Sequence, residues 1–575
     1  MRSRWSIQSR PEALPQQTST AGMSLLLRQC LANRGCISTD AASAFLDPRL
    51  KDLEDPSLLD GMDKAVDRLI TARDRSEPVV IFGDYDVDGV TSTALLCDCL
   101  SALGVRVDTY LPNRFEEGYG LTALAVENCL RRFNPRLLVA VDCGTTASSV
   151  VADLQSKGVD VVVVDHHQPT DAPPPAVALV NPHASTLPNS KGRELCSVGL
   201  AFKLAHALVR RLRERADPSA MSYDVRELLD LVALGTVADL VPLTGQNRIL
   251  VSAGLKRLES TQRPGLQALK GIAQIGNRVG VYEIGFQLGP RLNAAGRLET
   301  AAAALALLQT ASQSEAQRLA ASLDAQNRER QDIERRIVES LLADLRRRFD
   351  PARDFAIVEG RAEWHSGVLG IVASRVMRAF HRPVLILGGG SEEWKGSGRS
   401  IDGFDLAGAL QGCDDLLLKH GGHAMAAGVS LNPDRMDALR ERLNDLVRQR
   451  LDPLYLTPEL RLDAWVRLAE IDVPMLESLE RLGPFGMSNP AVQFAASRVR
   501  IDNPGRRMGS EGQHAKFRVR DGTGSQDVVW WNAESSAMPE GEFDLAFAPS
   551  INEFQGRRTV QLKLLDWRPS PPAVA

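Results

Sequence analysis

Short apolar runs rich in β-branched residues alternate with helix-like stretches in the first half of the chain. The four clearest runs are Val79–Phe82, Val105–Tyr110, Leu137–Val141 and Val159–Val164. This alternation is typical of βαβ units, in which helices connect and cover the strands of a parallel sheet. The sequence therefore predicts an α/β domain with a doubly wound parallel sheet over residues 51–305.

The rest of the chain predicts further domains, because its 575 residues exceed the roughly 100 to 200 of a usual domain. Residues 306–350 are predicted to contain a long connector helix, since apolar residues recur at four-residue spacing from Ile333 to Leu345. A smaller α/β domain is expected at 351–455. Short alternating strands at 456–570 suit a C-terminal OB-like β-barrel, and residues 1–50 form an N-terminal segment with weak signals.

Three carboxylates stand at alternate positions directly after the first apolar run: Asp84, Asp86 and Asp88. Alternation would place them on one side of an extended chain. Like charges so close together repel and raise one another's pKa, a cost that a divalent cation removes. A calcium-binding EF-hand loop is disfavoured because its twelfth position, normally Glu, is Leu95. We therefore expect a catalytic metal site here rather than a solvated acidic turn.

Carboxylates also follow the later runs: Asp142, the triplet Asp165-His166-His167, and Asp239 at the end of an apolar helical stretch. Taken singly, Asp142 and Asp239 could be turn or helix-cap residues. In an open parallel sheet, however, ligands bind outside the carboxyl ends of the strands, where all these residues can converge. The sequence thus predicts one acidic site built from several strand ends.

The donor set indicates which ions to expect. Hard carboxylate oxygens with one or two imidazoles suit Mn²⁺ or Mg²⁺ better than Zn²⁺, and the eight cysteines form no CxxC pair. The number of acids is enough for two ions. Two neighbouring ions activate water and stabilise a leaving oxygen, so the site predicts hydrolysis of a phosphoester or phosphoanhydride.

Overall charge says little about the partner, since the net charge is −4. A local excess appears between Arg498 and Arg520, where seven basic residues face two acidic ones. No apolar stretch approaches the roughly 20 residues that cross a bilayer, and the first residues lack the apolar block of a secretory signal. We therefore expect a cytoplasmic protein with no membrane partner.

An ordered set of motifs carries a resemblance to a known family. The motifs are GDYDVDGVT (83–91), VDCGTT (141–146), the triplet 165–167, LGTVADLVPL (234–243), LGPRLNAAGRL (288–298), SGRS (397–400) and GGHAMAAG (421–428). In this order the chain resembles the DHH/DHHA1 phosphoesterases and, among them, the RecJ family of single-stranded-DNA-specific exonucleases. The resemblance implies a DHH catalytic domain, a DHHA1 substrate-binding domain at 351–455 and an OB-like nucleic-acid-binding domain at 456–570.

The resemblance also implies roles for individual residues. Asp84, Asp86 and Asp142 would hold one ion, while Asp88, Asp142, His166 and Asp239 would hold the other, with Asp142 bridging them. His167 would act in catalysis beside the ions, or would support a ligand by a hydrogen bond.

Contacts with DNA are implied at eight positions: Arg114, Tyr119, Arg291, Asn293, Arg297, Ser397, Arg399 and His423. Tyr119 could stack on a base, and the Arg399 guanidinium could bind a 5′-terminal phosphate with two parallel hydrogen bonds. Gly421-Gly422-His423 is expected to form a turn before a helix of small residues, which could offer backbone N–H groups to a phosphate.

Together these features predict a two-metal 5′-to-3′ exonuclease that degrades single-stranded DNA to 5′-mononucleotides in recombination and repair. The resemblance suggests work after a helicase and near a single-strand-binding protein. One alternative is a DHH-type phosphodiesterase or pyrophosphatase for small nucleotides, which the long C-terminal region disfavours. The other is a non-catalytic DNA-binding replication scaffold, which the presence of every expected acid and of His166 disfavours.

Overall fold

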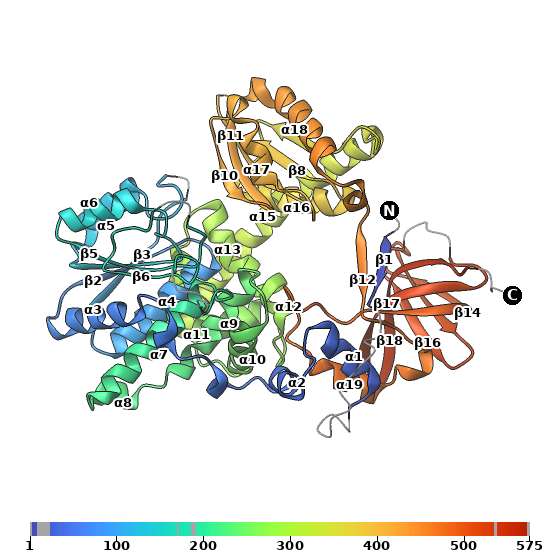
Figure 1. Cartoon of the computed structure of the whole chain (residues 1–575), viewed down its shortest axis with the longest axis horizontal. Helices are drawn as coiled ribbons and strands as arrows, with labels where there is room; N and C mark the ends of the chain where they lie inside the picture. Colours follow the sequence, from blue (N-terminus) through green and yellow to red (C-terminus); the bar gives the residue numbers. More distant parts are fainter. Residues whose placement is uncertain are drawn as a thin grey trace. The chain divides into compact units, whose positions relative to one another are not determined.

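The computed structural model describes residues 3–8, 23–114, 116–169, 172–185, 191–390, 392–533 and 538–571, with the side chain of Pro504 left out. The chain divides into two compact units. One contains Asp47–Arg330 and Pro484–Pro490, and the other contains Met1–Leu46, Gln331–Gly483 and Ala491–Ala575. Figure 1 shows the elements of each unit, which are described separately below.

A five-stranded parallel sheet organises the first unit. Its strands are β2 (Val79–Gly83), β3 (Val107–Tyr110), β4 (Leu137–Val141), β5 (Asp160–Val164) and β6 (Ala178–Val180). Their order is β3-β2-β4-β5-β6, and every pair is parallel. The chain steps from β2 to one neighbour and then returns to the other side, which creates a topological switch point between β2 and β4.

Helices cover both faces of this sheet. On one face, the side chains of Ile81 and Val139 pack with helices α3 (Met62–Asp74), α4 (Val87–Ala102) and α7 (Ser197–Glu214). On the other, Phe82 and Ala140 pack with α5 (Ala123–Phe133) and α6 (Ser148–Ser156). Burial on both faces explains why the strands are continuously apolar rather than alternating. The doubly wound parallel sheet predicted from the sequence is confirmed.

Further helices complete the first unit. They are α8 (Pro218–Ser222), α9 (Leu229–Ala238), α10 (Gly245–Glu259), α11 (Pro264–Ile272), α12 (Val281–Glu283), α13 (Gly289–Leu298) and α14 (Ala302–Gln309). Helix α15 (Gln313–Arg348) is the predicted connector, and the division between the units falls within it. Its Ile337, Leu341 and Leu345 are buried rather than exposed.

The second unit contains a smaller α/β sheet of order β10-β11-β9-β8-β7. Its strands are β7 (Ile357–Arg361), β8 (Val384–Gly388), β9 (Trp394–Arg399), β10 (Lys419–His423) and β11 (Ala426–Leu431), with helices α16 (Leu369–Phe380), α17 (Leu406–Gln411) and α18 (Met436–Arg450). The prediction of a helix after His423 is wrong. The small residues there pair as a β-hairpin, with His423 opposite Ala426 and Gly421 opposite Gly428.

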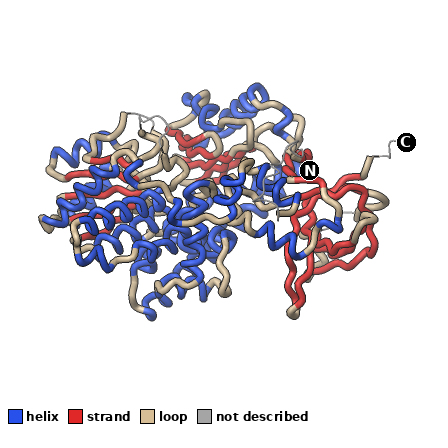
Figure 2. The backbone as a smooth tube through the Cα atoms, turned by 60° about the horizontal axis from the view of Figure 1, so that its bottom comes forward, coloured by secondary structure: helices blue, strands red, loops and turns tan. Residues whose placement is uncertain are grey.

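The C-terminal strands form the expected barrel. They are β13 (Ala464–Trp465), β14 (Phe494–Met508), β15 (His514–Arg520), β16 (Ser525–Trp530), β17 (Phe543–Phe554) and β18 (Arg557–Pro569). The order is β13-β14-β15-β16-β18-β17, and an additional pairing of β14 with β17 closes the sheet on itself. Figure 2 shows these strands gathered around a common interior. The OB-like fold is confirmed.

The N-terminal segment belongs to this second unit and contains more structure than its sequence suggested. Strand β1 (Arg4–Ile7) pairs in parallel with β12 (Glu459–Leu462), and two helices follow, α1 (Leu25–Asn33) and α2 (Thr39–Leu46). Helix α19 (Val473–Glu480) lies between β13 and β14 in the chain. Across all the described residues, the helices are too short or too polar to traverse a lipid bilayer.

A buried polar contact supports the first unit away from the acidic site. Asp230, in the first turn of α9 and only 1% exposed, accepts hydrogen bonds from the Thr261 hydroxyl (2.7 Å) and from Arg263 Nε (3.2 Å). We expect Asp230→Ala to destabilise the protein by about 3 kcal/mol, because it leaves these donors buried with fewer acceptors. Thermal unfolding followed by circular dichroism measures the change.

The matched control is Asp153→Ala, which removes the exposed ion pair with Lys157 on α6. An exposed pair contributes less than about 1 kcal/mol, so this variant should melt close to the wild type. Equal melting temperatures for the two variants would contradict a stabilising role for the Asp230 contact.

Candidate metal centre

The acidic site lies at the carboxyl ends of neighbouring strands. Asp84 directly follows β2, Asp142 follows β4 and Asp165 follows β5. The site therefore lies at the switch point of the sheet, the position at which open α/β sheets bind their ligands. Asp142 adopts a positive φ of 61°, an uncommon conformation for a residue other than glycine. Such a conformation persists only where the surrounding structure holds it.

The expectation that Asp84, Asp86 and Asp88 alternate along an extended chain is wrong. Helix α4 begins at Val87, so Asp86 is its N-cap and Asp88 lies in its first turn. The Asp86 carboxylate accepts hydrogen bonds from the backbone N–H groups of Asp88 (2.9 Å) and Gly89 (3.2 Å). This capping favours a helix directly after the strand, and period-two spacing alone could not reveal it.

Glycine at position 89 permits this abrupt transition. A Cβ atom there would lie 2.5 Å from the Asp84 carbonyl oxygen and 2.7 Å from the Asp84 carbonyl carbon. These distances are shorter than van der Waals contact, so a larger residue would force the start of α4 away from the end of β2. The glycine of this motif therefore keeps the acids of the strand end and of the helix close together.

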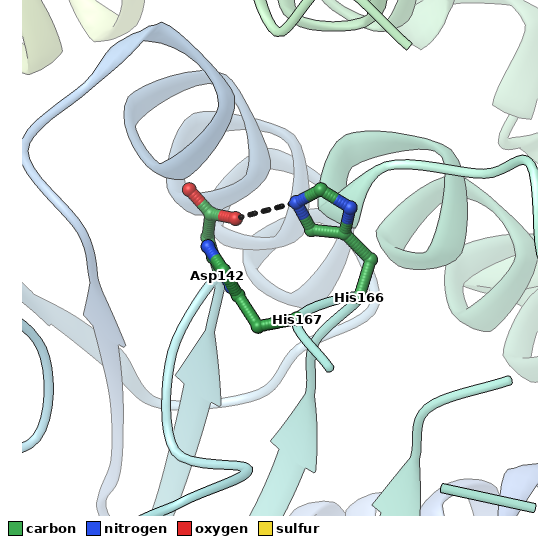
Figure 3. A group of neighbouring side chains, drawn as sticks. All are labelled: Asp142, His166 and His167. Carbon is green, nitrogen blue, oxygen red and sulfur yellow. Dashed lines mark ion pairs between the residues drawn. The ribbon is translucent and has the colours of Figure 1, made fainter. Parts of the chain in front are cut away.

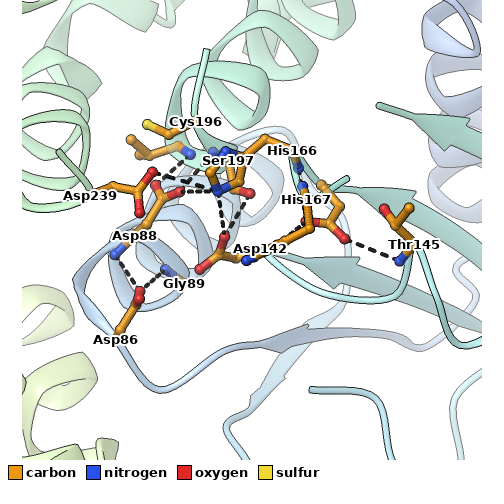
Figure 4. Close-up of polar contacts among 12 residues, drawn as sticks. Asp86, Asp88, Gly89, Asp142, Thr145, His166, His167, Cys196, Ser197 and Asp239 are labelled. Carbon is orange, nitrogen blue, oxygen red and sulfur yellow. Dashed lines mark hydrogen bonds and ion pairs between the residues drawn. The ribbon is translucent and has the colours of Figure 1, made fainter. Parts of the chain in front are cut away.

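The side chains converge on two adjoining groups that could each hold a cation, and on a third group that overlaps both. In the first, single oxygens of Asp84, Asp86 and Asp142 all lie within 4.8 Å of one another; in the second, ligand atoms of Asp88, His166 and Asp239 do so; the third consists of Asp142, His166 and His167. Asp239 is the C-cap of α9 and reaches the second of these groups from a second helix. Figure 4 shows Asp86, Asp88, Asp142, His166 and Asp239 close together beside the helices and strand ends.

His166 links the two groups. Its Nε2 atom lies 3.6 Å from Asp142 Oδ1, 3.9 Å from Asp88 Oδ2 and 3.5 Å from Asp239 Oδ2. Figure 3 shows His166 directed toward Asp142, as its dashed line marks. Burial and the charge of His167 lower the pKa of His166 to about 4, which keeps the imidazole neutral. A neutral imidazole is the form that binds metals.

Without a cation, ionisation of all these carboxyl groups at neutral pH is unfavourable. Burial, and then the neighbouring carboxylates, raise the pKa of Asp84 and Asp142 well above the ordinary value. The same causes raise the pKa of Asp88 to about 7 and that of Asp239 to about 9. Asp84 Oδ1 and Asp239 Oδ2 are buried and accept no hydrogen bond from the described residues. Buried oxygens with unused lone pairs fit divalent cations.

A separate set of hydrogen bonds holds the ring of His167 in place. Its Nδ1 lies 2.7 Å from Asp165 Oδ1, and its Nε2 lies 3.0 Å from the Tyr119 hydroxyl. Burial alone would lower the pKa of His167, but the hydrogen bond and charge of Asp165 outweigh it and raise the pKa to about 9. His167 is therefore cationic at neutral pH. Thr145 donates its backbone N–H to Asp165 (3.1 Å), which holds the carboxylate in place.

One residue at the site was missed by sequence reasoning. The backbone N–H of Ser197 donates to Asp88 Oδ2 (2.7 Å), and its hydroxyl donates to Asp142 Oδ1 (2.8 Å). Ser197 stands in none of the motifs, and the contact with Asp88 spans 109 positions of the chain. No local pattern in the sequence marks it.

The other residues predicted in the first unit have different surroundings. The Arg114 guanidinium lies over the ring of Tyr85, 5.3 Å from its centroid. Arg291 is engaged elsewhere, since its Nε donates to Asp324 (2.9 Å) on α15 and its Nη1 to the Gln287 carbonyl (2.8 Å). Asn293 and Arg297 are half-buried on α13.

In the second unit, Ser397 and Arg399 lie together on β9. Arg399 Nη1 donates to Ser397 Oγ (3.1 Å), and a Cβ atom at Gly370, near the start of α16, would lie 2.9 Å from both side chains. The register places Arg399 opposite Ala426, and Ala426 opposite His423, so all three side chains share one face of the sheet.

The face beside Arg399 is open and lacks acidic partners. Cβ atoms at Gly421 and Gly428 would meet nothing within 4 Å. Within the described residues, Arg399 donates to Ser397 Oγ and to the Gly398 carbonyl and pairs with no carboxylate, and burial lowers the pKa of its guanidinium. We call the open surface formed by Gly421 and Gly428 the glycine floor. A half-buried guanidinium that has no counter-charge and lies on the same face of the sheet as the glycine floor is suited to bind an anion.

Comparison with known proteins agrees with this architecture. Family descriptions match three segments: "DHH family, N-terminal domain" at residues 78–236, "DHHA1 domain" at 354–449 and "RecJ OB domain" at 462–566. The "Single-stranded-DNA-specific exonuclease RecJ" of Dickeya dadantii is 39% identical over 93% of this chain and 95% of its own length. The protein of the same name from Bacillus subtilis is 36% identical over 98% of this chain and 70% of its own.

A solved structure extends the likeness to three dimensions. The crystal structure of RecJ in complex with Mn²⁺ from Thermus thermophilus has a TM-score of 0.85 and 32% sequence identity, covering 100% of this chain and 80% of that one. The matched domains follow one another in the same order as the folded domains described above. The chain therefore belongs to the RecJ family of DHH/DHHA1 phosphoesterases.

Proposed function

We propose that this chain is a metal-dependent exonuclease that hydrolyses single-stranded DNA from its 5′ end and releases 5′-mononucleotides during DNA recombination and repair. The observation that carries the proposal is the convergence of Asp84, Asp86, Asp88, Asp142, His166 and Asp239 at the switch point of the sheet. The names of the relatives in Dickeya and Bacillus support single-stranded DNA as the substrate.

We assign two Mn²⁺ or Mg²⁺ ions to this cluster. Asp84, Asp86 and Asp142 would hold one ion, and Asp88, Asp142, His166 and Asp239 the other. The convergence of Asp84 with Asp86 and Asp142, and of Asp88 with His166 and Asp239, supports this assignment, as does the 3.6 Å distance from Asp142 Oδ1 to His166 Nε2. The oxygen-rich donor set and the Mn²⁺ in the Thermus structure support these ions. When bound, such ions supply a hydroxide near neutral pH and stabilise the charge on the phosphoryl group.

His167 is assigned to the scissile phosphate. Asp165 keeps its imidazole protonated and fixes the ring by the hydrogen bond at Nδ1. The Tyr119 hydroxyl contacts the opposite nitrogen, Nε2. An imidazolium has two N–H groups, and Asp165 engages only the one at Nδ1, so the Nε2–H can exchange the Tyr119 hydroxyl for a phosphate oxygen beside the metal cluster. The proposal therefore gives His167 a catalytic role and Tyr119 a role in orienting it.

Only some of the remaining residues that the sequence predicts to contact DNA in the first unit are available to do so. Arg114, Tyr119, Asn293 and Arg297 stay assigned to the bound strand. Tyr119 is 53% exposed as a whole residue, and its ring can also stack on a base. Because Asp324 already engages Arg291, we assign Arg291 to positioning α13 rather than to direct neutralisation of a phosphate.

The 5′-terminal phosphate is assigned to Ser397, Arg399 and His423. Support comes from the open glycine floor, the Arg399 guanidinium without an acidic partner and the start of α16 close beside it. A helix N-terminus and a guanidinium fork both favour a phosphate dianion. We further propose that the enzyme acts in the cytoplasm. It would act after a helicase, which separates the strands, and near a single-strand-binding protein, which covers them.

The proposal is tested first by a substrate panel. With Mn²⁺ present, a 5′-phosphorylated single strand should be degraded to 5′-mononucleotides, whereas a blunt duplex, a dinucleotide and pyrophosphate should react far more slowly, as chromatography of the products will show. EDTA should abolish the reaction. Hydrolysis confined to the dinucleotide or to pyrophosphate would favour a small-nucleotide enzyme, and DNA binding without cleavage would favour the scaffold.

Asp142→Ala is expected to reduce cleavage by roughly 1,000-fold or more, because it removes the carboxylate shared by both ions. Binding of single-stranded DNA, measured by fluorescence anisotropy in EDTA, should change by less than about threefold. Asp108→Ala is the control, since Asp108 is an exposed acid on β3 of the same sheet. Parallel loss of binding and cleavage in Asp142→Ala would point to misfolding instead.

Arg399→Ala is expected to lower the preference for a 5′-phosphate over a 5′-hydroxyl end by about tenfold, the order of a charge-assisted hydrogen bond. The measurement compares kcat/KM for the two ends. Arg378→Ala, an exposed arginine on α16, should keep the preference. An unchanged preference in Arg399→Ala would remove this residue from recognition of the 5′ end.

A further inference from the structure

Helix α7 begins against two carboxylates of the metal centre, and its first residue is Ser197. We propose that Ser197 is a positioning residue, whose backbone N–H and hydroxyl together fix the orientation of Asp88 and Asp142 for the ions. This inference rests on the proposed function and deepens it, since it concerns how the same centre is held. Ser197 need not touch an ion or the DNA.

Asp88 is held by both of its oxygens. Oδ2 accepts the Ser197 N–H at 2.7 Å and Oδ1 accepts the Val198 N–H at 2.8 Å. A carboxylate has about four lone-pair positions, so two amides fix its plane and still leave positions for a cation. The side chain is 1% exposed, and no water can substitute for these donors without opening the packing.

The Ser197 hydroxyl holds the second carboxylate. Its Oγ lies 2.8 Å from Asp142 Oδ1, the same oxygen that lies 3.6 Å from His166 Nε2. Ser197 is 0% exposed and Asp142 is 2% exposed, so the hydrogen bond is shielded from solvent. One residue therefore contacts a carboxylate from the end of β4 and a carboxylate from α4.

The start of α7 is suited to this task. Its N-cap residue, Cys196, makes no side-chain cap, so the first amides of the helix are satisfied by Asp88 instead. The N-terminus of an 18-residue helix carries partial positive charge and favours a carboxylate there. In effect, Asp88 of α4 caps α7, and the cap joins the two helices at the metal centre.

Close packing keeps Ser197 in register with its partners. A Cβ atom at Gly235 on α9 would lie 2.3 Å from Thr91 Oγ1 on α4 and 2.8 Å from Val198 Cγ1 on α7. The three helices that contribute Asp88, Ser197 and Asp239 therefore approach as closely as a glycine allows. Displacement of α7 alone would break both hydrogen bonds of Ser197.

The test separates the two groups of Ser197. Ser197→Ala removes the hydroxyl and keeps the N–H. Ser197→Pro removes both and puts its Cδ where the N–H pointed at Asp88 Oδ2, 2.7 Å from the nitrogen, so it also displaces that carboxylate. Proline is compatible with the first position of a helix, as Pro218 in α8 and Pro264 in α11 show, and Cys196 already has the extended conformation (ψ 177°) that precedes proline. Mn²⁺ affinity is measured by calorimetry without DNA, so it does not depend on cleavage.

Ser197→Ala should weaken Mn²⁺ binding about tenfold, and Ser197→Pro should weaken it further, toward 100-fold, the range found for residues that orient metal ligands. At limiting Mn²⁺, kcat should fall while KM for DNA stays unchanged, and excess Mn²⁺ should restore much of kcat. A purely structural role would instead lower the melting temperature of the metal-free protein and leave Mn²⁺ affinity intact.

Two matched controls are available in the same unit. Ser148→Ala removes the hydroxyl of another serine at the first position of a helix, whose Oγ donates to the Ala172 carbonyl away from the acids. Ala123→Pro places proline at the first position of α5, after the extended Thr122. Both should bind Mn²⁺ like the wild type.

Mn²⁺ affinity within twofold of the wild type in Ser197→Ala would overturn the hydroxyl contribution, and equal affinities of the alanine and proline variants would overturn that of the N–H. Should the proline variant fail to fold, the alanine variant still decides the role of the hydroxyl. A wild-type chain that binds Mn²⁺ but cleaves no DNA would contradict the proposed function and leave this inference standing.

Discussion

Repulsion among buried carboxylates is the constraint on which the catalytic unit depends. Five acids and one imidazole converge at the switch point, yet no lysine or arginine of the described residues forms an ion pair with those acids. Backbone N–H groups oppose part of the charge, at Asp86 from the start of α4 and at Asp88 from the start of α7. Cationic His167 and partial protonation of the acids offset more of the charge, and ionising all five carboxylates together calls for bound divalent cations.

Glycines make such a cluster sterically possible. Gly89 lets α4 begin against the end of β2, and Gly235 lets α9 approach α4 and α7. Gly296 brings α13 close to Tyr85, where an added Cβ would lie 2.9 Å from the Tyr85 carbonyl oxygen. The same positions stand within the motifs that carry the family resemblance. Their role is therefore close approach of backbone, which brings ligands from separate elements to a common centre.

The sequence predicted the parallel sheet well, because strands buried on both faces are continuous β-branched runs bounded by turns. The acids at strand ends followed from the same pattern. The spacing of Asp84, Asp86 and Asp88 gave a wrong prediction, because Asp86 caps helix α4 by hydrogen bonds. The three acids therefore do not alternate along a strand. The prediction of a helix over residues 421–428 was also wrong. The small residues there form a β-hairpin with an open face.

Contacts between distant segments left no local signal at all. Ser197 meets Asp88 across 109 positions, and Arg291 meets Asp324 across 33. The first adds a residue to the centre that no motif marks. The second engages a basic residue that its motif alone would assign to phosphate contact. A residue type and its motif thus predict what a side chain can do, whereas its partners decide whether it is available to do it.

The same reasoning applies to the basic run of the barrel. Arg500 pairs with Glu542, Arg520 lies 3.5 Å from Asp502, and Lys516 and Arg518 share Asp527. Much of the excess counted along the sequence is therefore neutralised in the fold, and these exposed pairs weaken readily in salt. Arg399 is half-buried, and no carboxylate in the part of the chain that the structure describes opposes its charge. Recognition of a terminal phosphate should accordingly depend on that single guanidinium more than on the number of basic residues in the barrel.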